Sequence, residues 1–196
     1  AKVTRHIDRI ATAGRELLQM IDRIIDMGRA DTEQLELHPE PVSLPLLVEE
    51  VIAVQRKAMD GKQIELRVDI DTGLTDLELD PLRFKQVLQA FLDNAVHFSP
   101  ASGHVAIRVQ ADSDALLRIE VEDTGIGIAE EDLPKLFQSY TQLSTGLTKA
   151  HQGLGIGLAL TRRIVEAQNG HVGVHSVVGQ GSVFFAVLPR DMSRPG

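Results

Sequence analysis

Two glycine clusters are the residues of this chain whose types and spacing most clearly suggest chemistry. The first occupies 123–127 as Asp-Thr-Gly-Ile-Gly, and the second occupies 153–157 as Gly-Leu-Gly-Ile-Gly. A polar stretch, 138–152, lies between them. Glycine lets a backbone approach a ligand closely, and a helix that begins after the second cluster would point free N–H groups at an anion. The pattern predicts a lid over a phosphate-containing ligand, although a glycine pair alone usually marks only a turn.

Two polar residues could bind the other parts of such a ligand. Asn94 lies within a predicted helix, where asparagine is a poor helix former, and its amide oxygen could be a ligand of Mg²⁺. The alternative is a solvated asparagine on an exposed face. Asp123 ends a predicted buried strand and could accept a hydrogen bond from an exocyclic amine such as that of adenine, or it could simply be an Asx-turn residue. The residues alone leave these alternatives open.

Other nucleotide-binding folds fit less well. The Walker pattern G-x-x-x-x-G-K-[ST] does not occur, and the protein-kinase landmarks H-R-D and D-F-G are absent. The second glycine cluster mimics a Rossmann fingerprint, but such a fingerprint must follow a strand. Residues 145–152, which precede the cluster, are instead polar and typical of a loop.

The composition is that of a globular protein and excludes several functional classes. Of the 196 residues 43% are hydrophobic and 24% are charged, the formal net charge is −8, and there is no cysteine. A negative net charge argues against broad nucleic-acid binding, and the lack of cysteine excludes disulfides and thiolate metal sites. No apolar run approaches the roughly 20 residues of a membrane span. We expect a cytoplasmic fragment of a longer protein, with a membrane-anchored parent left open as an alternative.

The first part of the chain is predicted to be one long helix, 4–28, of the kind found in helix bundles. Its apolar and small residues follow a heptad stripe: Ile7, Ile10, Gly14, Leu17, Ile21, Ile24 and Gly28. One helix cannot bury such a stripe alone, so a partner helix is expected. A proline-containing connector, 30–45, follows, and the domain boundary is expected near 38–42.

Hydrophobic periodicity predicts a folded domain after this connector. The expected helices span 44–60, 82–98 and 156–168, with a short one at 130–137. The expected strands span 64–70, 77–79, 105–109, 117–121, 172–177 and 183–188, the last two as a hairpin. This order predicts an α+β fold: a two-layer α/β sandwich with helices on one face of a mixed, mostly antiparallel sheet.

Helix-boundary signals support this assignment. Ser43 is expected to cap the first of these helices and Gly61 to end it, while Asp80-Pro81 begins the second. We therefore divide the chain into 1–38, 39–190 and a loose polar tail, 191–196.

Five segments taken together resemble the ATP-binding catalytic domain of bacterial sensor histidine kinases, within the superfamily that also includes gyrase, Hsp90 and MutL. They correspond to an asparagine box at 86–99, a first glycine box at 123–128, a phenylalanine box at 136–140, a second glycine box at 153–160 and a last glycine box at 179–184. The resemblance covers about residues 43–190. Five motifs in the right order are far more specific than any one of them.

The resemblance implies that ATP and Mg²⁺ bind here and assigns roles to individual residues. Asn94 would hold Mg²⁺, Asp123 would read the adenine amine, and Phe98 would stack near the base. The implied catalytic residues are Asn94, His97 and Lys149, the last as a γ-phosphate contact. The implied nucleotide-binding residues are Asn94, His97, Phe98, Asp123, Gly125, Gly127, Ile128, Phe137, Gly153, Leu154, Gly155, Ile156, Gly157 and Leu158.

The N-terminal helix also fits this family. Residues 15–26 resemble the second helix of its dimerisation hairpin, which implies a homodimer. The first helix of the hairpin, which carries the phosphoacceptor histidine, is not expected within this chain, because His6 is followed by Ile7 and not by an acidic residue. The implied partners are ATP, that missing helix and a response regulator or receiver domain, with no nucleic acid. The implied activity is that of a protein-histidine kinase.

Three positions depart from the family pattern. Ala90 stands where an asparagine is usual, and where hydrolytic relatives carry a catalytic glutamate; His97 replaces a lysine or arginine, and Leu154 replaces a small hydroxyl residue. We therefore expect slow ATP hydrolysis and weaker Mg²⁺ binding. Two alternatives follow: a degenerate nucleotide-binding signalling module without efficient transfer, and an ATPase clamp of the Hsp90 or MutL type, which Ala90 disfavours.

Overall fold

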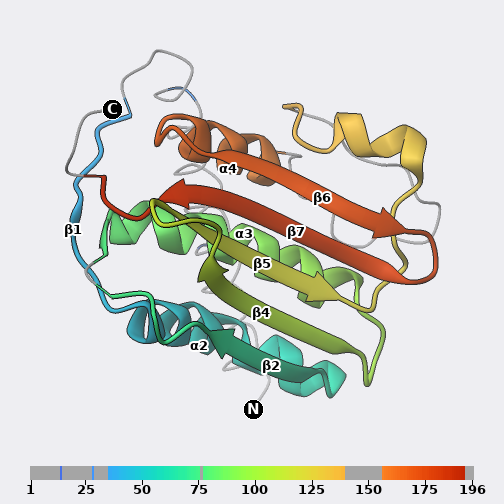
Figure 1. Ribbon diagram of the computed structural model, residues 1–196. Helices are drawn as coiled ribbons and strands as arrows, with labels where there is room; N and C mark the ends of the chain where they lie inside the picture. Colours follow the sequence, from blue (N-terminus) through green and yellow to red (C-terminus); the bar gives the residue numbers. More distant parts are fainter. Residues whose placement is uncertain (1–13, 15–27, 29–34, 76, 140–155, 193–196) are drawn as a thin grey trace.

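The computed structural model describes residues 35–75, 77–139 and 156–192, together with Gly14 and Gly28, which are both helical. Its centre is a five-stranded sheet with the order β2-β4-β5-β7-β6. The strands are β2 (Glu65–Ile70), β4 (His104–Ala111), β5 (Leu116–Asp123), β6 (His171–Val177) and β7 (Gly181–Pro189). Helices α2 (Leu44–Lys62), α3 (Pro81–Phe98) and α4 (Gly157–Glu166) cover one face, as Figure 1 shows. The predicted α+β sandwich is confirmed.

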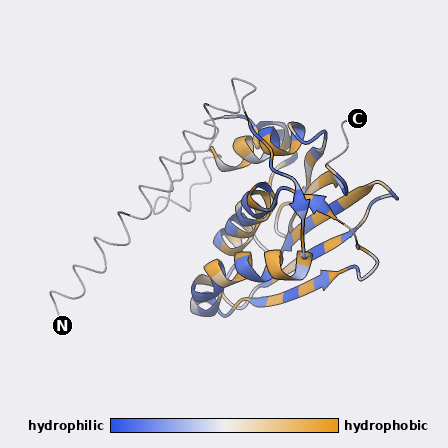
Figure 2. Cartoon of the chain, turned by 90° about the vertical axis from the view of Figure 1, so that its left-hand side faces the viewer, coloured by the Kyte–Doolittle hydropathy of each residue, from blue (hydrophilic) through white to orange (hydrophobic). Residues whose placement is uncertain are grey.

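The sheet forms because apolar residues alternate along its strands. In β4 and β5 every second side chain is fully buried, and these are Val105, Ile107, Val109, Leu117, Ile119 and Val121. Figure 2 shows the resulting alternation of hydropathy along the strands. Strands β2 and β4 are parallel, and the other pairs are antiparallel, including the predicted β6–β7 hairpin. The mixed, mostly antiparallel character is therefore also confirmed.

Helix α3 runs beneath the sheet and begins where its sequence predicts. The Oδ1 atom of Asp80 accepts a hydrogen bond of 3.0 Å from the amide of Arg83, and Pro81 occupies the first helical position. The apolar stripe of the helix is buried between the sheet and α2, and its members are Phe84, Val87, Leu88, Phe91, Leu92 and Ala95. This stripe fixes which face of α3 is left for a ligand.

The ends of α2 differ from the prediction. Ser43 occupies the N-cap position, but its side chain makes no capping hydrogen bond. Gly61 lies inside the helix and does not end it; the left-handed residue that follows α2 is Gln63, with φ of 55°. Gly61 has a helical conformation, and the helix continues to Lys62. A glycine near the expected end of a helix therefore does not by itself locate that end.

A small second sheet was not predicted. Strand β1 (Glu40–Pro41), within the expected connector, pairs antiparallel with β3 (Glu78–Leu79). The predicted loose tail also begins later than expected, because the amide of Met192 donates to Glu78 and the amide of Glu78 donates to Arg190. The two segments that flank the domain thus lie together, as Figure 1 shows at the left edge of the domain.

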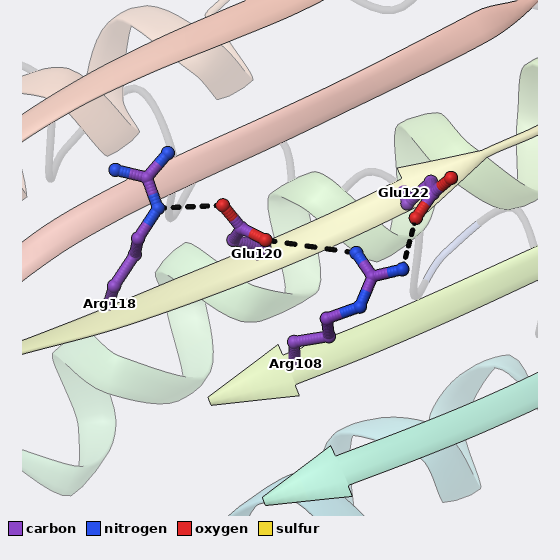
Figure 3. Close-up of polar contacts among 4 residues, drawn as sticks. All are labelled: Arg108, Arg118, Glu120 and Glu122. Atoms are coloured by element: carbon purple, nitrogen blue, oxygen red, sulfur yellow. Dashed lines mark hydrogen bonds and ion pairs between the residues drawn. The ribbon is translucent and has the colours of Figure 1, made fainter. Parts of the chain in front are cut away.

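The outer face of the sheet, away from the helices, carries a chain of ion pairs. Figure 3 shows Arg118 beside Glu120, Glu120 beside Arg108, and Arg108 beside Glu122. The Arg118 Nε–Glu120 Oε1 distance is 2.6 Å, and the Arg108 Nη1–Glu120 Oε2 distance is 3.7 Å. Hydrogen bonding to Glu122 raises the pKa of Arg108. This face of β4 and β5 is therefore polar, and its carboxylates have cationic partners.

Apart from Gly14 and Gly28, the predicted N-terminal helix, 4–28, falls outside the described residues, and so does the second glycine cluster up to Gly155. Within the part of the chain that the structure describes, no helix is long and apolar enough to cross a membrane.

Candidate functional site

The candidate site is built around Asp123, the last residue of β5. Its side chain points to the helix-covered side of the sheet and is only 4% exposed. The amide of Gly125 donates a hydrogen bond of 2.7 Å to Oδ1, which is the Asx-turn geometry considered as an alternative role. Burial raises the pKa of Asp123 to about 6, although backbone hydrogen bonds from Gly125 and Ser182 partly oppose this. A buried carboxyl that titrates near neutral pH is a candidate for a functional role.

The glycines beside Asp123 are required by close packing. A Cβ atom on Gly125 would lie 2.6 Å from Asp123 Oδ1 and 2.8 Å from the carbonyl oxygen of Phe98 at the end of α3. Gly127 has a φ of +67°, and a Cβ there would lie 2.0 Å from the carbonyl oxygen of Val177. The turn after β5 is thus pressed between the end of α3 and the end of β6, which only glycine permits.

Two serines that sequence reasoning missed connect this turn to the β6–β7 hairpin. Ser176 Oγ accepts a hydrogen bond of 2.9 Å from the amide of Ile128 and donates one of 2.8 Å to the carbonyl oxygen of Gly181. Because its single proton is used in this way, the 3.0 Å contact with Ser182 Oγ has Ser182 as donor. Both serines are polar residues in otherwise apolar strands beside the Gly179–Gly181 turn. This exception to the strand pattern was the feature of the sequence that could have indicated them.

The C-terminal half of α3 contributes the other predicted residues. Asn94 is half-buried, and its side chain makes no hydrogen bond to any residue that the structure describes. The rings of His97 and Phe98 are exposed and pack edge to face with centroids 4.7 Å apart. Asp93, by contrast, accepts from the side-chain amides of Gln55 and Gln89, so it has a structural role between α2 and α3.

The second glycine cluster is described only from Ile156 onward. Ile156 is buried at the N-cap of α4, and its carbonyl oxygen accepts a hydrogen bond of 2.8 Å from the amide of Leu160. Gly157 begins the helix, and, its chain neighbours and its own helix backbone aside, no described residue lies within 4 Å of where its Cβ atom would be. Leu158 packs partly against the core. The predicted site residues Lys149, Gly153, Leu154 and Gly155 lie outside the described residues.

Phe137 lies just after the short 3₁₀ helix η1 (Glu130–Lys135), where the sequence predicts a helix. Its side chain packs partly buried against the hydrophobic core, as does that of Ile128. Among the predicted residues, the structure places Gly125 against both the side chain of Asp123 and the backbone carbonyl group of Phe98.

These residues fit an adenine nucleotide. The buried Asp123 can accept a hydrogen bond from an amine, and Phe98 offers an exposed aromatic ring on the adjoining turn. Among the described residues no group of three or more His, Cys, Asp or Glu side chains could hold a metal ion. Mg²⁺ does not need such a cage, because it keeps several waters and binds phosphate oxygens. The side-chain amide oxygen of Asn94 would be the protein ligand in such an arrangement.

Comparison with known proteins agrees with this geometry. Residues 79–192 match the family described as histidine kinase-, DNA gyrase B-, and HSP90-like ATPase. The chain belongs to this family. The match includes α3, β5, the turn after Asp123 and the β6–β7 hairpin, so every described part of the candidate site lies within it.

Several relatives of this chain are named as histidine or sensory kinases. It is 36% identical over 188 residues to the circadian input-output histidine kinase CikA of Synechococcus elongatus, which covers 95% of this chain and 25% of CikA. It is 34% identical over 175 residues to the adaptive-response sensory kinase SasA of a Synechococcus species, covering 89% of this chain and 46% of SasA. The chain thus spans a quarter to a half of these relatives and is the ATP-binding catalytic portion of a sensor histidine kinase.

A solved structure shares the fold of this chain. The crystal structure of full-length ShkA in complex with AMPPNP matches with a TM-score of 0.83 and 28% sequence identity. The match covers 96% of this chain and 39% of ShkA. The likeness to the ShkA structure therefore includes the described domain.

Proposed function

We propose that this chain transfers the γ-phosphoryl group of ATP to a histidine on another helix of its parent protein, as part of a two-component system. The observation that carries the proposal is the buried carboxyl of Asp123, held at the end of β5 by Gly125 and the end of α3. The ShkA structure, which shares this fold at 28% sequence identity and is in complex with AMPPNP, supports nucleotide binding by this chain.

In this proposal the chain acts mainly by positioning. Asp123 and Phe98 hold the base, and Gly125 and Gly127 shape the pocket around it. Asn94 holds Mg²⁺, which neutralises phosphate charge when bound. His97, Lys149 and the 153–158 cluster, together with Ile128 and Phe137, complete the predicted binding set. The acceptor imidazole nitrogen forms a bond to phosphorus as the bond to the β-phosphate oxygen breaks, so that ADP leaves.

The proposed organisation extends to the parts outside the described residues. Residues 1–38 form the second helix of a dimerisation hairpin with its connector, and 39–190 form the catalytic domain, followed by the tail 191–196. The chain acts as a homodimer in the cytoplasm, where ATP is available. The phosphoryl group is passed on to a response regulator or receiver domain. Support comes from the histidine-kinase relatives, which this chain matches over most of its length.

One observation favours a second candidate, a nucleotide-binding module that transfers phosphate poorly. Ala90 is half-buried one turn before Asn94, and a methyl group there neither binds metal nor activates water. The same residue argues against an ATPase clamp of the Hsp90 or MutL type, which needs a catalytic carboxylate at this position.

The first test is titration of the chain with AMPPNP, with and without Mg²⁺, by calorimetry. We expect binding that Mg²⁺ strengthens. Absence of binding in both titrations would contradict the proposal and both alternatives.

The second test supplies the missing helix. A peptide hairpin that contains the phosphoacceptor histidine of the parent protein is mixed with the chain and ATP labelled at the γ-phosphate. Acid-labile label on the hairpin is expected for a kinase. Tight ATP binding without transfer would favour the degenerate module, and release of free phosphate without the hairpin would favour the clamp.

A further inference from the structure

Lys62, the last residue of α2, reaches the C-terminal end of α3. Its Nζ atom lies 2.8 Å from the carbonyl oxygen of Val96, 2.7 Å from that of His97 and 3.1 Å from that of Ser99. An ammonium group has three N–H donors and no acceptor, so these contacts use all of its donors. The lysine is thus bound entirely to backbone groups that lie more than thirty positions away in sequence.

These carbonyl groups need a partner, because the last turn of a helix leaves its carbonyls without intrahelical donors. A positive charge at this end also interacts favourably with the helix dipole. The backbone of Lys62 is tied to the same region, since its carbonyl oxygen accepts a hydrogen bond of 2.8 Å from the amide of Ser102. Lys62 therefore caps α3 from a neighbouring helix.

The capped turn is the one that borders the candidate site. Within residues 96–99, the carbonyl group of Phe98 is the one that Lys62 does not bind. Its oxygen lies close to Gly125, because a Cβ atom added to Gly125 would be only 2.8 Å from it. The turn is consequently held on one side by Lys62 and on the other by the turn after Asp123. The rings of His97 and Phe98 project from it.

We propose that Lys62 is a positioning residue of the nucleotide site: its ammonium group holds the last turn of α3 in register with the turn formed by 123–125. This inference rests on the proposed function. In this role Lys62 contacts no phosphate, because its donors are already bound to carbonyl groups.

The test compares Lys62→Met with a matched control, Lys57→Met, an exposed lysine of the same helix. Dissociation constants for ADP and AMPPNP are measured with Mg²⁺, at a temperature at which circular dichroism shows each variant folded. We expect Lys62→Met to weaken both ligands by the same factor, about tenfold, because a charged hydrogen-bonded group is lost at the base end of the site. Lys57→Met should change neither constant.

The conservative variant Lys62→Arg should recover part of the affinity, because it keeps the charge and several donors. If Lys62→Met does not fold, Lys62→Gln takes its place, since its amide keeps two donors, and about a threefold loss is expected. Affinities equal to wild type in the folded Lys62 variant would overturn the positioning role and leave the proposed function intact. A loss confined to AMPPNP would overturn it in favour of a direct phosphate contact. If the wild type binds neither ligand, the proposed function fails and the positioning role fails with it.

Discussion

Two neighbouring residues at the end of β5 show how differently this protein treats a carboxylate. Glu122 faces the outer side of the sheet, is 41% exposed and pairs with Arg108, as Figure 3 shows. Asp123 faces the helices, is 4% exposed and is bound by backbone amides. Burial raises the pKa of Asp123 to about 6, while Glu122 contributes to the ion-pair chain of the outer face.

The difference separates a stabilising group from a ligand-binding one. An exposed ion pair contributes little because water already solvates its charges. A buried carboxylate without a cationic partner destabilises the domain until a ligand donates to it. The buried charge of Asp123 thus lowers the stability of the ligand-free domain, and a bound amine would reduce this penalty. Substitution of Asp123 should therefore change nucleotide affinity strongly, whereas substitution of Glu122 should not.

The largest effect is expected for Asp123→Asn on nucleotide affinity. The substitution keeps the shape but removes the charge and places an N–H donor where the base is proposed to donate. We expect AMPPNP binding to weaken by roughly a hundredfold or more, measured by calorimetry. Glu122→Gln is the matched control and should bind normally; comparable losses in both variants would remove the distinction between the two carboxylates.

The second effect concerns stability and has the opposite sign. The pKa of Asp123 is raised from its ordinary value of 3.8 to about 6 in the folded state, so the folded state holds the proton more tightly than the unfolded state. The tighter proton binding contributes to the unfolding free energy below pH 3.8, and this contribution is lost as the pH rises through 6. At pH 7.5 Asp123→Asn should therefore be more stable than wild type by as much as about 3 kcal/mol.

Urea unfolding of the ligand-free proteins between pH 4 and pH 7.5 measures this difference. The stability gap between Asp123→Asn and wild type should widen with rising pH and level off above about pH 7. In the same pH range AMPPNP should bind wild type more weakly as the pH falls below 6, because the protonated carboxyl of Asp123 is a weaker hydrogen-bond acceptor than the carboxylate. A gap that stays constant across this range would show that Asp123 is not buried as described.

The third effect tests the close packing that holds Asp123 in place. In Gly125→Ala the new methyl group would meet both Asp123 Oδ1 and the backbone carbonyl of Phe98. We expect a loss of about 1–3 kcal/mol in unfolding free energy, and weaker AMPPNP binding. Gly61→Ala in α2 is the control: it has open space and a helical conformation, so it should stabilise by up to about 1 kcal/mol. A tolerated Gly125→Ala would argue against the tight contact between this turn and α3.

The smallest effect is expected on the outer face. Arg108→Gln removes the central cation of the chain that joins Glu120 and Glu122. Because the side chains are partly exposed, the loss in unfolding free energy should stay below about 1 kcal/mol and shrink with added salt. Nucleotide affinity should be unchanged. A large loss of affinity would mean that the outer face is coupled to the site.

Much of the fold could be predicted because it depends on local patterns. Alternating apolar residues indicated β2, β4 and β5, and the pair Asp80-Pro81 located the start of α3. The strand at 77–79 was predicted, but its pairing with β1 in a separate small sheet could not be, because β1 has only two residues and shows no periodicity. Gly61 misled for a related reason: whether a glycine ends a helix depends on its backbone angles, which its type alone does not decide.

The candidate site shows the same division. Asp123, Gly125 and Asn94 were selected from residue type and spacing, and their roles remain predictions. Lys62 and Ser176 were not selected, since a lysine at a helix end and a serine in a strand have many ordinary explanations. Their importance depends on partners at Val96 and Ile128, which are distant in sequence.

The sequence by itself determined the elements, their order and the glycine-rich turns, because periodicity and backbone freedom act over a few residues. Only the tertiary structure decided that Asp123 is buried, with no cationic partner among the described residues, while Glu122 pairs with Arg108. It also decided that α3 is capped by a lysine from α2. The physical reason is that burial, and therefore the cost of a charge, depends on which distant segments pack around a residue.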